Sequence, residues 1–205
     1  MSFAAARAAD TTGLVLAGGR GSRMGGLDKG LVQWRGEALA LRAMRRLRPQ
    51  VAGVAVNANR HQATYAQWGV PVWPDADLAF AGPMAGLLAG LTHCRTDWLV
   101  TVPCDTPLFP LDLVARLAAA AEQAGRGVAM AATPAADGPE AQPVFLLVHR
   151  SLRGDVAHAL AAGERRVGRW AAVQQAALAL FDDTDAFANA NTPAELAALP
   201  PDIAP

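Results

Sequence analysis

Glycines and cations gather in one short stretch that could hold phosphate groups. Residues 16–29 read L-A-G-G-R-G-S-R-M-G-G-L-D-K and continue an apolar run that begins at Gly13. Backbone N–H groups can approach an anion closely where no Cβ stands in the way. Arg23 and Lys29 add positive charge, and the compact charge of Lys29 suits a phosphate undergoing displacement. The residue types therefore predict a phosphate-binding loop, with an ordinary glycine-rich surface turn as the alternative.

The spacing of this loop excludes two common phosphate-binding motifs. A dinucleotide fingerprint G-x-G-x-x-G that begins at Gly19 would place its third glycine at Met24. A Walker A loop needs Ser or Thr after a Gly-Lys pair, whereas Lys29 follows Asp28 and precedes Gly30. The loop therefore belongs to another kind of phosphate site.

Asp105 is a second candidate for chemistry. It follows the apolar run at residues 98–102 and lies between Pro103 and Pro107, which hold the turn rigid. Magnesium prefers oxygen ligands and is usually held by one or two carboxylates together with substrate phosphates. A carboxylate at a strand end that faces a phosphate loop thus predicts a magnesium site. The alternative is an Asp that caps its own turn.

Phosphoryl and nucleotidyl transfer depend mainly on positioning and charge neutralisation, and Arg23, Lys29 and Asp105 supply both. Ser22 and Cys104 could be nucleophiles, but neither has a histidine close in sequence to act as its base. The residues therefore favour transfer without a covalent intermediate on the protein.

The composition limits the classes of partner. The chain has 205 residues with 18 Lys plus Arg and 18 Asp plus Glu, so its charge gives no sign of a nucleic-acid or membrane-surface partner. No apolar run approaches the roughly 20 residues of a membrane span, and residues 1–12 lack the continuous apolar core of a signal peptide. Cys94 and Cys104 lack C-x-x-C spacing and fit a reducing compartment. We expect a cytoplasmic protein.

Regular elements must bring these residues together. The apolar run at 13–16, an amphipathic helix at 37–48 and an alternating strand at 51–56 predict a βαβ unit with parallel strands. Residues 98–102 are nearly all apolar, as in a strand that is buried on both faces. The first half of the chain therefore has the pattern of an α/β protein.

The rest of the chain continues this pattern. Further strands are predicted at 70–73, 128–132, 144–148 and 178–181, and further helices at 61–68, 110–123, 152–162 and 193–199. A glycine-rich joint at 82–86 opens another helical run through Leu91. Leu111 is placed on the apolar face of the 110–123 helix, and residues 133–141 are predicted as a loop. We predict a three-layer α/β/α arrangement around a mostly parallel sheet. It forms a single domain over 13–199, with a flexible N-terminal tail at 1–12 and a C-terminal tail at 200–205.

This arrangement gathers the candidate residues at one edge of the sheet. In open α/β sheets, ligands bind outside the carboxyl ends of the strands. The 16–29 loop, Asn57, Asp75 and Asp105 all follow predicted strands. We therefore expect them to line one binding site.

Six motifs, spread in order over residues 16–196, resemble the bacterial molybdenum cofactor guanylyltransferases of the MobA type. They are the 16–29 loop, V-N-A-N-R-H, G-P-M-A-G, V-P-C-D-T-P, A-G-E-R-R-V and F-A-N-A-N-T-P-A-E-L. The first motif is shared by many nucleotidyltransferases of the sugar-nucleotide pyrophosphorylase type, whereas the full series is specific. The resemblance implies a Rossmann-like nucleotidyltransferase fold.

The resemblance also implies an activity and its partners. Members of the family transfer GMP from GTP to the terminal phosphate of molybdopterin that carries molybdenum, with Mg²⁺ as the cofactor. The products are the guanine dinucleotide form of the cofactor and pyrophosphate. GTP and molybdopterin would be the substrates, and molybdenum-insertion proteins and molybdoenzyme chaperones would be the protein partners.

Matching motif positions imply particular roles. Contacts to guanine and the phosphates are implied for Leu16, Ala17, Gly18, Gly19 and Lys29, with Arg23 on the triphosphate. Asn57 and Asp75 would complete the nucleotide pocket, and Asp105 would bind magnesium. Catalysis would thus depend on Arg23, Lys29 and Asp105. On the acceptor side, the implied residues are Arg165 or Arg166, Asn189 and Asn191, with Asn191 near the metal. N-T-P is also an ordinary helix start with Thr192 as the cap.

Three other functions stay open from the sequence. A sister enzyme uses CTP to make the cytosine dinucleotide form, although the Gly18-Gly19 pair goes with guanine in the resemblance. A sugar-phosphate nucleotidyltransferase is disfavoured by the A-G-E-R-R-V and N-A-N-T-P segments. A non-catalytic carrier of the cofactor would not need Lys29 and Asp105, and both are present.

Overall fold

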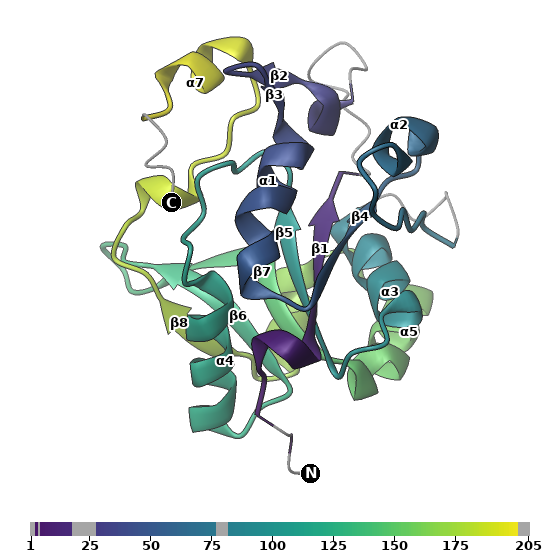
Figure 1. Cartoon of the computed structure of the whole chain (residues 1–205). Coiled ribbons are helices and arrows are strands. Elements are labelled where there is room, and N and C mark those ends of the chain that lie inside the picture. Colours follow the sequence, from purple (N-terminus) through teal and green to yellow (C-terminus); the bar gives the residue numbers. More distant parts are fainter. Residues whose placement is uncertain (1–2, 4, 18–27, 77–81, 201–205) are drawn as a thin grey trace.

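A six-stranded sheet forms the centre of the protein (Figure 1). The computed structural model describes residues 3, 5–17, 28–76 and 82–200. The strand order is β4-β1-β5-β7-β6-β8. The strands are β1 (Thr11–Leu16), β4 (Gly53–Asn57), β5 (Trp98–Pro103), β6 (Val128–Thr133), β7 (Glu140–His149) and β8 (Ala177–Leu180).

The sheet is mostly parallel, as the sequence predicts. β1 pairs in parallel with β4 and β5, and β6 pairs in parallel with β8. β7 runs antiparallel to both of its neighbours, β5 and β6. In the register of the sheet, Leu16 lies opposite Asn57 on one side and opposite Pro103 on the other. Three parallel strands therefore end together at the edge where ligands bind in α/β sheets.

Helices cover both faces of the sheet, which confirms the three-layer prediction (Figure 1). α1 (Leu39–Leu47) and α4 (Leu113–Ala124) pack on one face, and α3 (Pro83–His93), α5 (Arg153–Ala161) and α6 (Val167–Val173) pack on the other. Successive residues of a strand point to opposite faces, so Val15 joins the first core and Leu14 the second. Each fully buried aliphatic side chain of this kind contributes about 1.5–3 kcal/mol to stability.

A third, smaller core lies at the upper edge of the sheet in Figure 1. Trp34, in the hairpin of β2 (Gln33–Trp34) and β3 (Glu37–Ala38), packs in one cluster with Leu196 of α7 (Pro193–Ala198). Leu108 and Ala190 belong to the same cluster. The C-terminal segment is thereby held beside the hairpin that follows Lys29.

The remaining helical elements are short. They are α2 (Gln62–Ala66) and the 3-10 turns η1 (Ala8–Asp10), η3 (Lys29–Leu31), η4 (Arg48–Gln50), η5 (Arg150–Leu152) and η6 (Asp185–Phe187). In place of the strand predicted at 70–73, the structure has a single parallel bridge between Val56 and Val72. Within the described part of the chain, no helix has the length and apolar character that crossing a membrane requires.

Two predicted helices begin later than the sequence pattern indicates. The helix predicted at 37–48 begins at Leu39, because Glu37 and Ala38 pair with Trp34 and Gln33 in the hairpin. The helix predicted at 110–123 begins at Leu113, so the predicted apolar position Leu111 lies before it and is 41% exposed. In both segments, a local helical pattern yields to tertiary packing.

Other boundaries also differ from the prediction. β7 begins at Glu140, inside the predicted 133–141 loop, because residues 140–142 pair with β6 beyond a register shift at Met130 and Ala131. α6 was not predicted at all. Thr11 and Thr12, assigned to the N-terminal tail, belong to β1, and Phe3 packs against His149 with ring centroids 5.2 Å apart.

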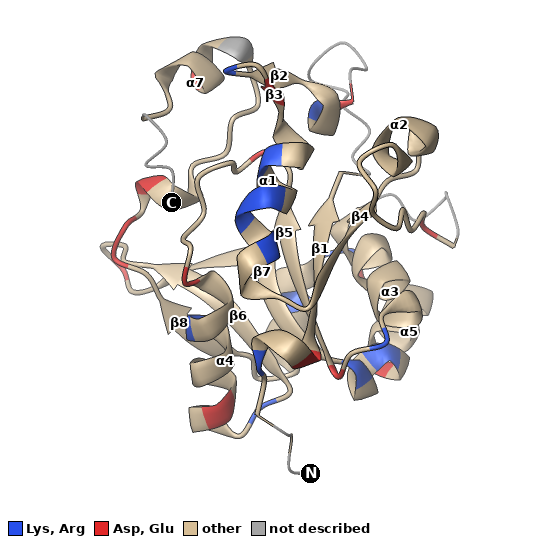
Figure 2. Ribbon diagram, in the orientation of Figure 1, with Lys and Arg blue, Asp and Glu red and all other residues tan. Residues whose placement is uncertain are grey.

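Charge is distributed over the whole ribbon (Figure 2). Basic residues recur along α1. The Glu37 carboxylate, in β3, forms ion pairs with the guanidinium groups of Arg42 and Arg45, each at 3.1 Å. The guanidinium of Arg42 also lies over the Trp34 ring, 4.4 Å from its centroid. These arginines therefore serve the packing of the hairpin on α1.

Candidate active site

Lys29, Asp105 and Asn191 meet at the carboxyl edge of the sheet. The Lys29 Nζ lies 3.1 Å from Asp105 Oδ2 and 2.5 Å from Asn191 Oδ1. The side chains of Lys29 and Asp105 are 21% and 20% exposed, so the cluster is partly shielded from water but open to a ligand. Two oxygens from distant parts of the chain thus converge on one cation.

The turn after β5 holds Asp105 in this place. Cys104 N–H donates to Leu16 O at 3.2 Å, which ties the turn to the end of β1. Within the described part of the chain, the Asp105 carboxylate bonds the Lys29 ammonium and not its own turn. The turn-capping alternative therefore does not describe this carboxylate.

The C-terminal segment is fastened to the same turn. Ala190 N–H donates to Asp105 O at 2.8 Å, and the Thr106 hydroxyl donates to Asn189 Oδ1 at 2.5 Å. The structure therefore brings Asn189 and Asn191, both predicted on the acceptor side, next to Asp105. Their position depends on the small core around Trp34.

The helix-start interpretation of N-T-P is also correct. Thr192 Oγ1 accepts from Glu195 N–H at 3.2 Å, and Asn191 N–H donates to Glu195 Oε2 at 2.6 Å. The first bond is that of an N-cap, and the second resembles a capping box except that Glu195 accepts from the residue before the cap. The backbone of Asn191 therefore serves α7 while its side chain faces Lys29.

A second polar group lies at the end of β4. Asn57 donates to Asp75 Oδ1 at 2.9 Å and to Trp73 O at 2.8 Å. Asn59 donates to Asp75 Oδ2 at 2.8 Å, and its own Oδ1 accepts Asp75 N–H at 2.8 Å. Asn57 and Asp75 are 3% and 7% exposed. The predicted pair Asn57 and Asp75 thus forms one fixed network, and Asn59 is the member that the sequence analysis missed.

Gly86 of α3 is required by this network. A Cβ at Gly86 would lie 2.5 Å from Asn57 Oδ1 and 2.8 Å from Leu16 Cδ2. The start of α3 can therefore approach the ends of β1 and β4 closely. The G-P-M-A-G motif pointed to this segment, but only the packing shows which of its glycines is needed and why.

The first strand joins the two polar groups. Leu16 O accepts from Cys104 N–H, and Ala17 N–H donates to Asn57 O at 2.9 Å. Leu16 and Ala17 therefore lie between the Asp105 cluster and the Asn57 network. Gly18, Gly19 and Arg23 lie outside the described residues.

Asp28 and Tyr65 are further polar residues of this region that the sequence analysis missed. Asp28 is 7% exposed, and its Oδ1 accepts from Tyr65 Oη at 2.6 Å and from Gly30 N–H at 3.1 Å. Burial raises the pKa of Tyr65, and the neighbouring Asp28 raises it further. The D-K-G triplet could have drawn attention to Asp28, but no local pattern indicates Tyr65.

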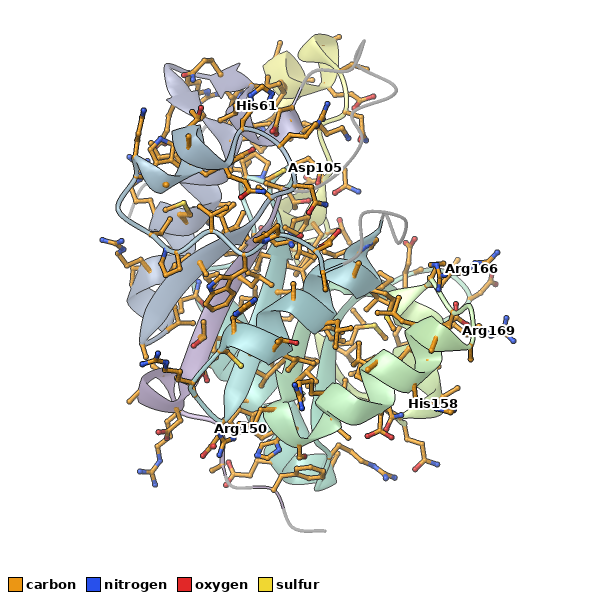
Figure 3. All side chains as sticks on the ribbon, turned by 90° about the vertical axis from the view of Figure 1, so that its right-hand side faces the viewer. His61, Asp105, Arg150, His158, Arg166 and Arg169 are labelled. Atoms are coloured by element: carbon orange, nitrogen blue, oxygen red, sulfur yellow. The ribbon has the colours of Figure 1, made fainter. Side chains whose placement is uncertain are left out.

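Arg165 and Arg166 lie apart from Asp105. Arg165 Nη1 donates to Leu160 O at 2.8 Å and to Glu164 O at 3.1 Å. The backbone N–H groups of Arg166 and Arg165 donate to the Glu164 carboxylate, and the Arg166 bond is the main cause of its lowered pKa. Figure 3 shows Arg166 and Arg169 pointing outward near α5 and away from Asp105.

A hollow of about 890 Å³ lies between α5 and α6, beside these arginines. His158 and Arg169 line it together with Arg165, Arg166 and Trp170. Arg169 reaches Glu164 at 3.3 Å and is 73% exposed. We call this the α5–α6 hollow.

Cys104 lies next to the cluster but is unsuited to act as a nucleophile. Its thiol is fully buried among apolar residues, and burial raises its pKa, so the thiol stays protonated at neutral pH. Among the described residues, no three His, Cys, Asp or Glu side chains form a metal-binding group. A metal at this edge would therefore need oxygens from its substrate as well as from Asp105.

The sheet and its edge define a class. Parallel strands end at a lysine–carboxylate cluster beside a buried amide–carboxylate network, at the edge where open α/β sheets bind their ligands. The pattern of the family described as the MobA-like NTP transferase domain matches residues 13–178.

Close relatives narrow the class to a family. The molybdenum cofactor guanylyltransferase of Acidovorax ebreus is 53% identical over 200 residues, which cover 93% of this chain and 95% of the relative. That of Cupriavidus taiwanensis is 52% identical over 190 residues, covering 92% and 96%. This chain belongs to the molybdenum cofactor guanylyltransferase family of MobA-like nucleotidyltransferases.

A solved structure shares the fold. The molybdopterin-guanine dinucleotide biosynthesis protein A of Archaeoglobus fulgidus superposes with a TM-score of 0.70. The match covers 91% of this chain and 95% of that chain, at 21% sequence identity. The predicted nucleotidyltransferase fold is therefore confirmed.

Proposed function

We propose that this protein transfers GMP from GTP to the terminal phosphate of molybdopterin and releases pyrophosphate. The observation that carries the proposal is the Lys29 ammonium held between Asp105 and Asn191 at the carboxyl edge of the sheet. The relatives that are 52–53% identical are guanylyltransferases by name. The cluster supplies the charge that such a transfer needs.

The reaction is an in-line displacement at the α-phosphorus of GTP. A phosphate oxygen of molybdopterin forms the new bond to this phosphorus, and the bond to the bridging oxygen of the β-phosphate breaks. The electron pair leaves with pyrophosphate. An ionised phosphate is already a nucleophile, so the step needs no general base. Lys29 stabilises the charge that develops on the departing group, together with Arg23.

We propose Asp105 as the protein ligand of Mg²⁺, with Asn191 beside it. Their oxygens already converge on one cation, the ammonium of Lys29, and oxygen donors of this kind suit magnesium. Bound there, the ion would neutralise charge on the phosphate oxygens of the substrate. The phosphates would supply its remaining ligands.

The nucleotide lies on the β1–β4 side of the site in our proposal. Leu16 and Ala17 would line it, Asn57 and Asp75 would complete the pocket, and we assign Gly18 and Gly19 to the same guanine and phosphate contacts. Both carboxylate oxygens of Asp75 already accept amide donors, so its orientation is set before a ligand arrives. A pocket with fixed polar walls loses less entropy on binding.

The acceptor would approach from the C-terminal side. Asn189 and Asn191 lie at the Asp105 turn, where they can meet the attacking phosphate. We assign Arg165 or Arg166, beside the α5–α6 hollow, to the more distant part of molybdopterin. The protein partners proposed are molybdenum-insertion proteins and molybdoenzyme chaperones, in the cytoplasm.

A coupled pyrophosphate assay with each nucleoside triphosphate in turn tests the proposal. We expect release from GTP, and only when molybdopterin and Mg²⁺ are supplied. Release from CTP instead would identify the cytosine dinucleotide activity. Binding of GTP and molybdopterin without pyrophosphate release would indicate a carrier.

A further inference from the structure

Lys29 is the only lysine of the chain, so one side chain supplies the only ammonium group besides the N-terminus. A lysine stem is flexible, and an ordered ammonium therefore needs a fixed backbone. In this structure Lys29 begins η3, a turn of three residues. The residue before Lys29 has a carboxylate that accepts a hydrogen bond from the residue after Lys29.

That carboxylate belongs to Asp28. Its Oδ1 accepts the N–H of Gly30 at 3.1 Å, so it bridges the residue before Lys29 and the residue after it. Asp28 is also the N-cap residue of η3. The turn is thereby closed around Lys29.

Tyr65 holds the carboxylate from the other side. Its hydroxyl donates to the same Asp28 oxygen at 2.6 Å, and its side chain is fully buried. A buried charge is costly unless it is hydrogen-bonded, and Tyr65 meets that requirement for Asp28. Burial and Asp28 both raise the pKa of Tyr65, so the hydroxyl remains a donor at neutral pH.

The fit between the turn and Tyr65 is close. A Cβ at Gly30 would collide with the Tyr65 hydroxyl and would lie 3.1 Å from Ala17 Cβ. Tyr65 is supported in turn by Trp68, whose ring meets it edge-on with centroids 5.1 Å apart. The Tyr65 hydroxyl therefore occupies space that is left open only because residue 30 is a glycine.

We propose that Tyr65 and Asp28 are a positioning pair for Lys29, which they hold so that its ammonium reaches the Asp105 edge. The proposal rests on the proposed function, because the phosphate role of Lys29 is part of that function. Tyr65 acts through Asp28 and does not touch the reacting atoms. It also links the two halves of the site, since α2 follows the segment that carries Asn57 and Asn59.

A direct test observes Lys29 without any nucleotide. Reductive methylation with ¹³C-formaldehyde labels Lys29 and the N-terminal amine, and NMR then resolves two methylated amines that the Lys29→Met variant assigns. In Tyr65→Phe we expect the Lys29 signal to move toward that of a free dimethyl-lysine and to become narrower. Asp28→Asn should move it in the same direction. An unchanged Lys29 signal in both variants would overturn the proposal.

A double-mutant cycle tests whether the effect runs through Lys29. We expect Tyr65→Phe to raise the Kd for GTP about tenfold, and to have no further effect when Lys29→Met is already present. Equal fold losses in the two backgrounds would show that Tyr65 acts independently of Lys29.

Trp68→Phe is the matched control. It trims the ring that supports Tyr65 and leaves the hydroxyl in place, so we expect the wild-type NMR signal and Kd. The same change as in Tyr65→Phe would mean that a loosened α2 is responsible, which would overturn the role of the hydroxyl. The NMR comparison needs no substrate, so it separates failure of the positioning pair from failure of the guanylyl transfer.

Discussion

The Lys29 cluster and the α5–α6 hollow are both polar regions, but they are built in opposite ways. The Lys29 cluster joins residues that are 76 and 162 positions apart in the chain. In the hollow, Arg165 Nη1 donates to the carbonyl oxygens of Leu160 and Glu164, which are five positions and one position away. The first region exists only when the whole sheet and the C-terminal segment are assembled, whereas the second is formed by two neighbouring helices.

The two regions also differ in their exposure to water. Lys29 and Asp105 have side chains about one-fifth exposed, whereas Arg169 at the hollow is 73% exposed. Charge interactions weaken as water and salt screen them, and exposed ion pairs contribute about 0–1 kcal/mol. Changes at the Lys29 cluster should therefore have larger effects on activity than changes at the hollow.

The largest effect is expected for Asp105→Ala. Loss of the carboxylate removes the proposed magnesium ligand and one partner of Lys29, so pyrophosphate release should fall at least ~100-fold. Circular dichroism should show an intact fold. Asp97→Ala is the control, because Asp97 precedes the same strand at its other end and pairs with Arg150 at 3.0 Å. More than a few per cent of wild-type activity at saturating Mg²⁺ would contradict the metal assignment.

A smaller effect is expected for Gly86→Ala. The added Cβ meets Asn57 Oδ1 and Leu16, so the Asn57 network must shift. We expect about tenfold weaker GTP binding by calorimetry and a stability loss of about 1–3 kcal/mol.

Gly90→Ala in the same helix separates these two consequences. Its Cβ would lie 2.6 Å from side-chain carbons of Leu14 and Leu99, which belong to the core and not to the pocket. It should lower the Tm and leave GTP binding unchanged. Equal losses of GTP affinity in both variants would show that general loosening of α3, and not the Asn57 network, is responsible.

At the α5–α6 hollow we expect a more modest effect. Arg166→Ala should raise the KM for molybdopterin about fivefold without changing GTP binding, because an exposed guanidinium contributes little. Steady-state kinetics with each substrate varied in turn measure the two constants. Arg153→Ala, an exposed arginine at the start of α5, is the control. A loss of GTP affinity in Arg166→Ala would contradict the separation of the two regions.

The smallest effect is expected at His149, the last residue of β7, which pairs with Trp98 at the opposite end of β5 from Asp105. Burial is the main cause that lowers the pKa of His149, so the unfolded chain binds more protons than the folded one below about pH 6.5. Stability is therefore lost as the pH falls through this range. His149→Gln should reduce the drop in Tm between about pH 7.5 and 5.5 by a degree or two and leave activity at neutral pH unchanged. His158→Gln, at an exposed position of α5, is the matched substitution with which the change in His149→Gln is compared.

Local patterns predicted much of the molecule. Runs of apolar residues indicated β1, β4, β5 and β6, and motif order indicated the family. The strand ends predicted that Asp105 and Asn57 would face one edge, since parallel strands end together. Helix starts were less predictable. Glu37 pairs with Trp34 in a hairpin and not in the helix, because Trp34 packs in the small core beside α7.

The amino-acid sequence by itself determined the layers and the residues available at the strand ends, because side-chain periodicity decides which face is buried. The tertiary structure decided their partners. Asp75 is held by Asn59, Asp28 by Tyr65, and Lys29 meets Asn191 across 162 positions. No local pattern specifies such pairs, since hydrogen bonds between distant segments form only where the packed sheet and its third core bring the segments together.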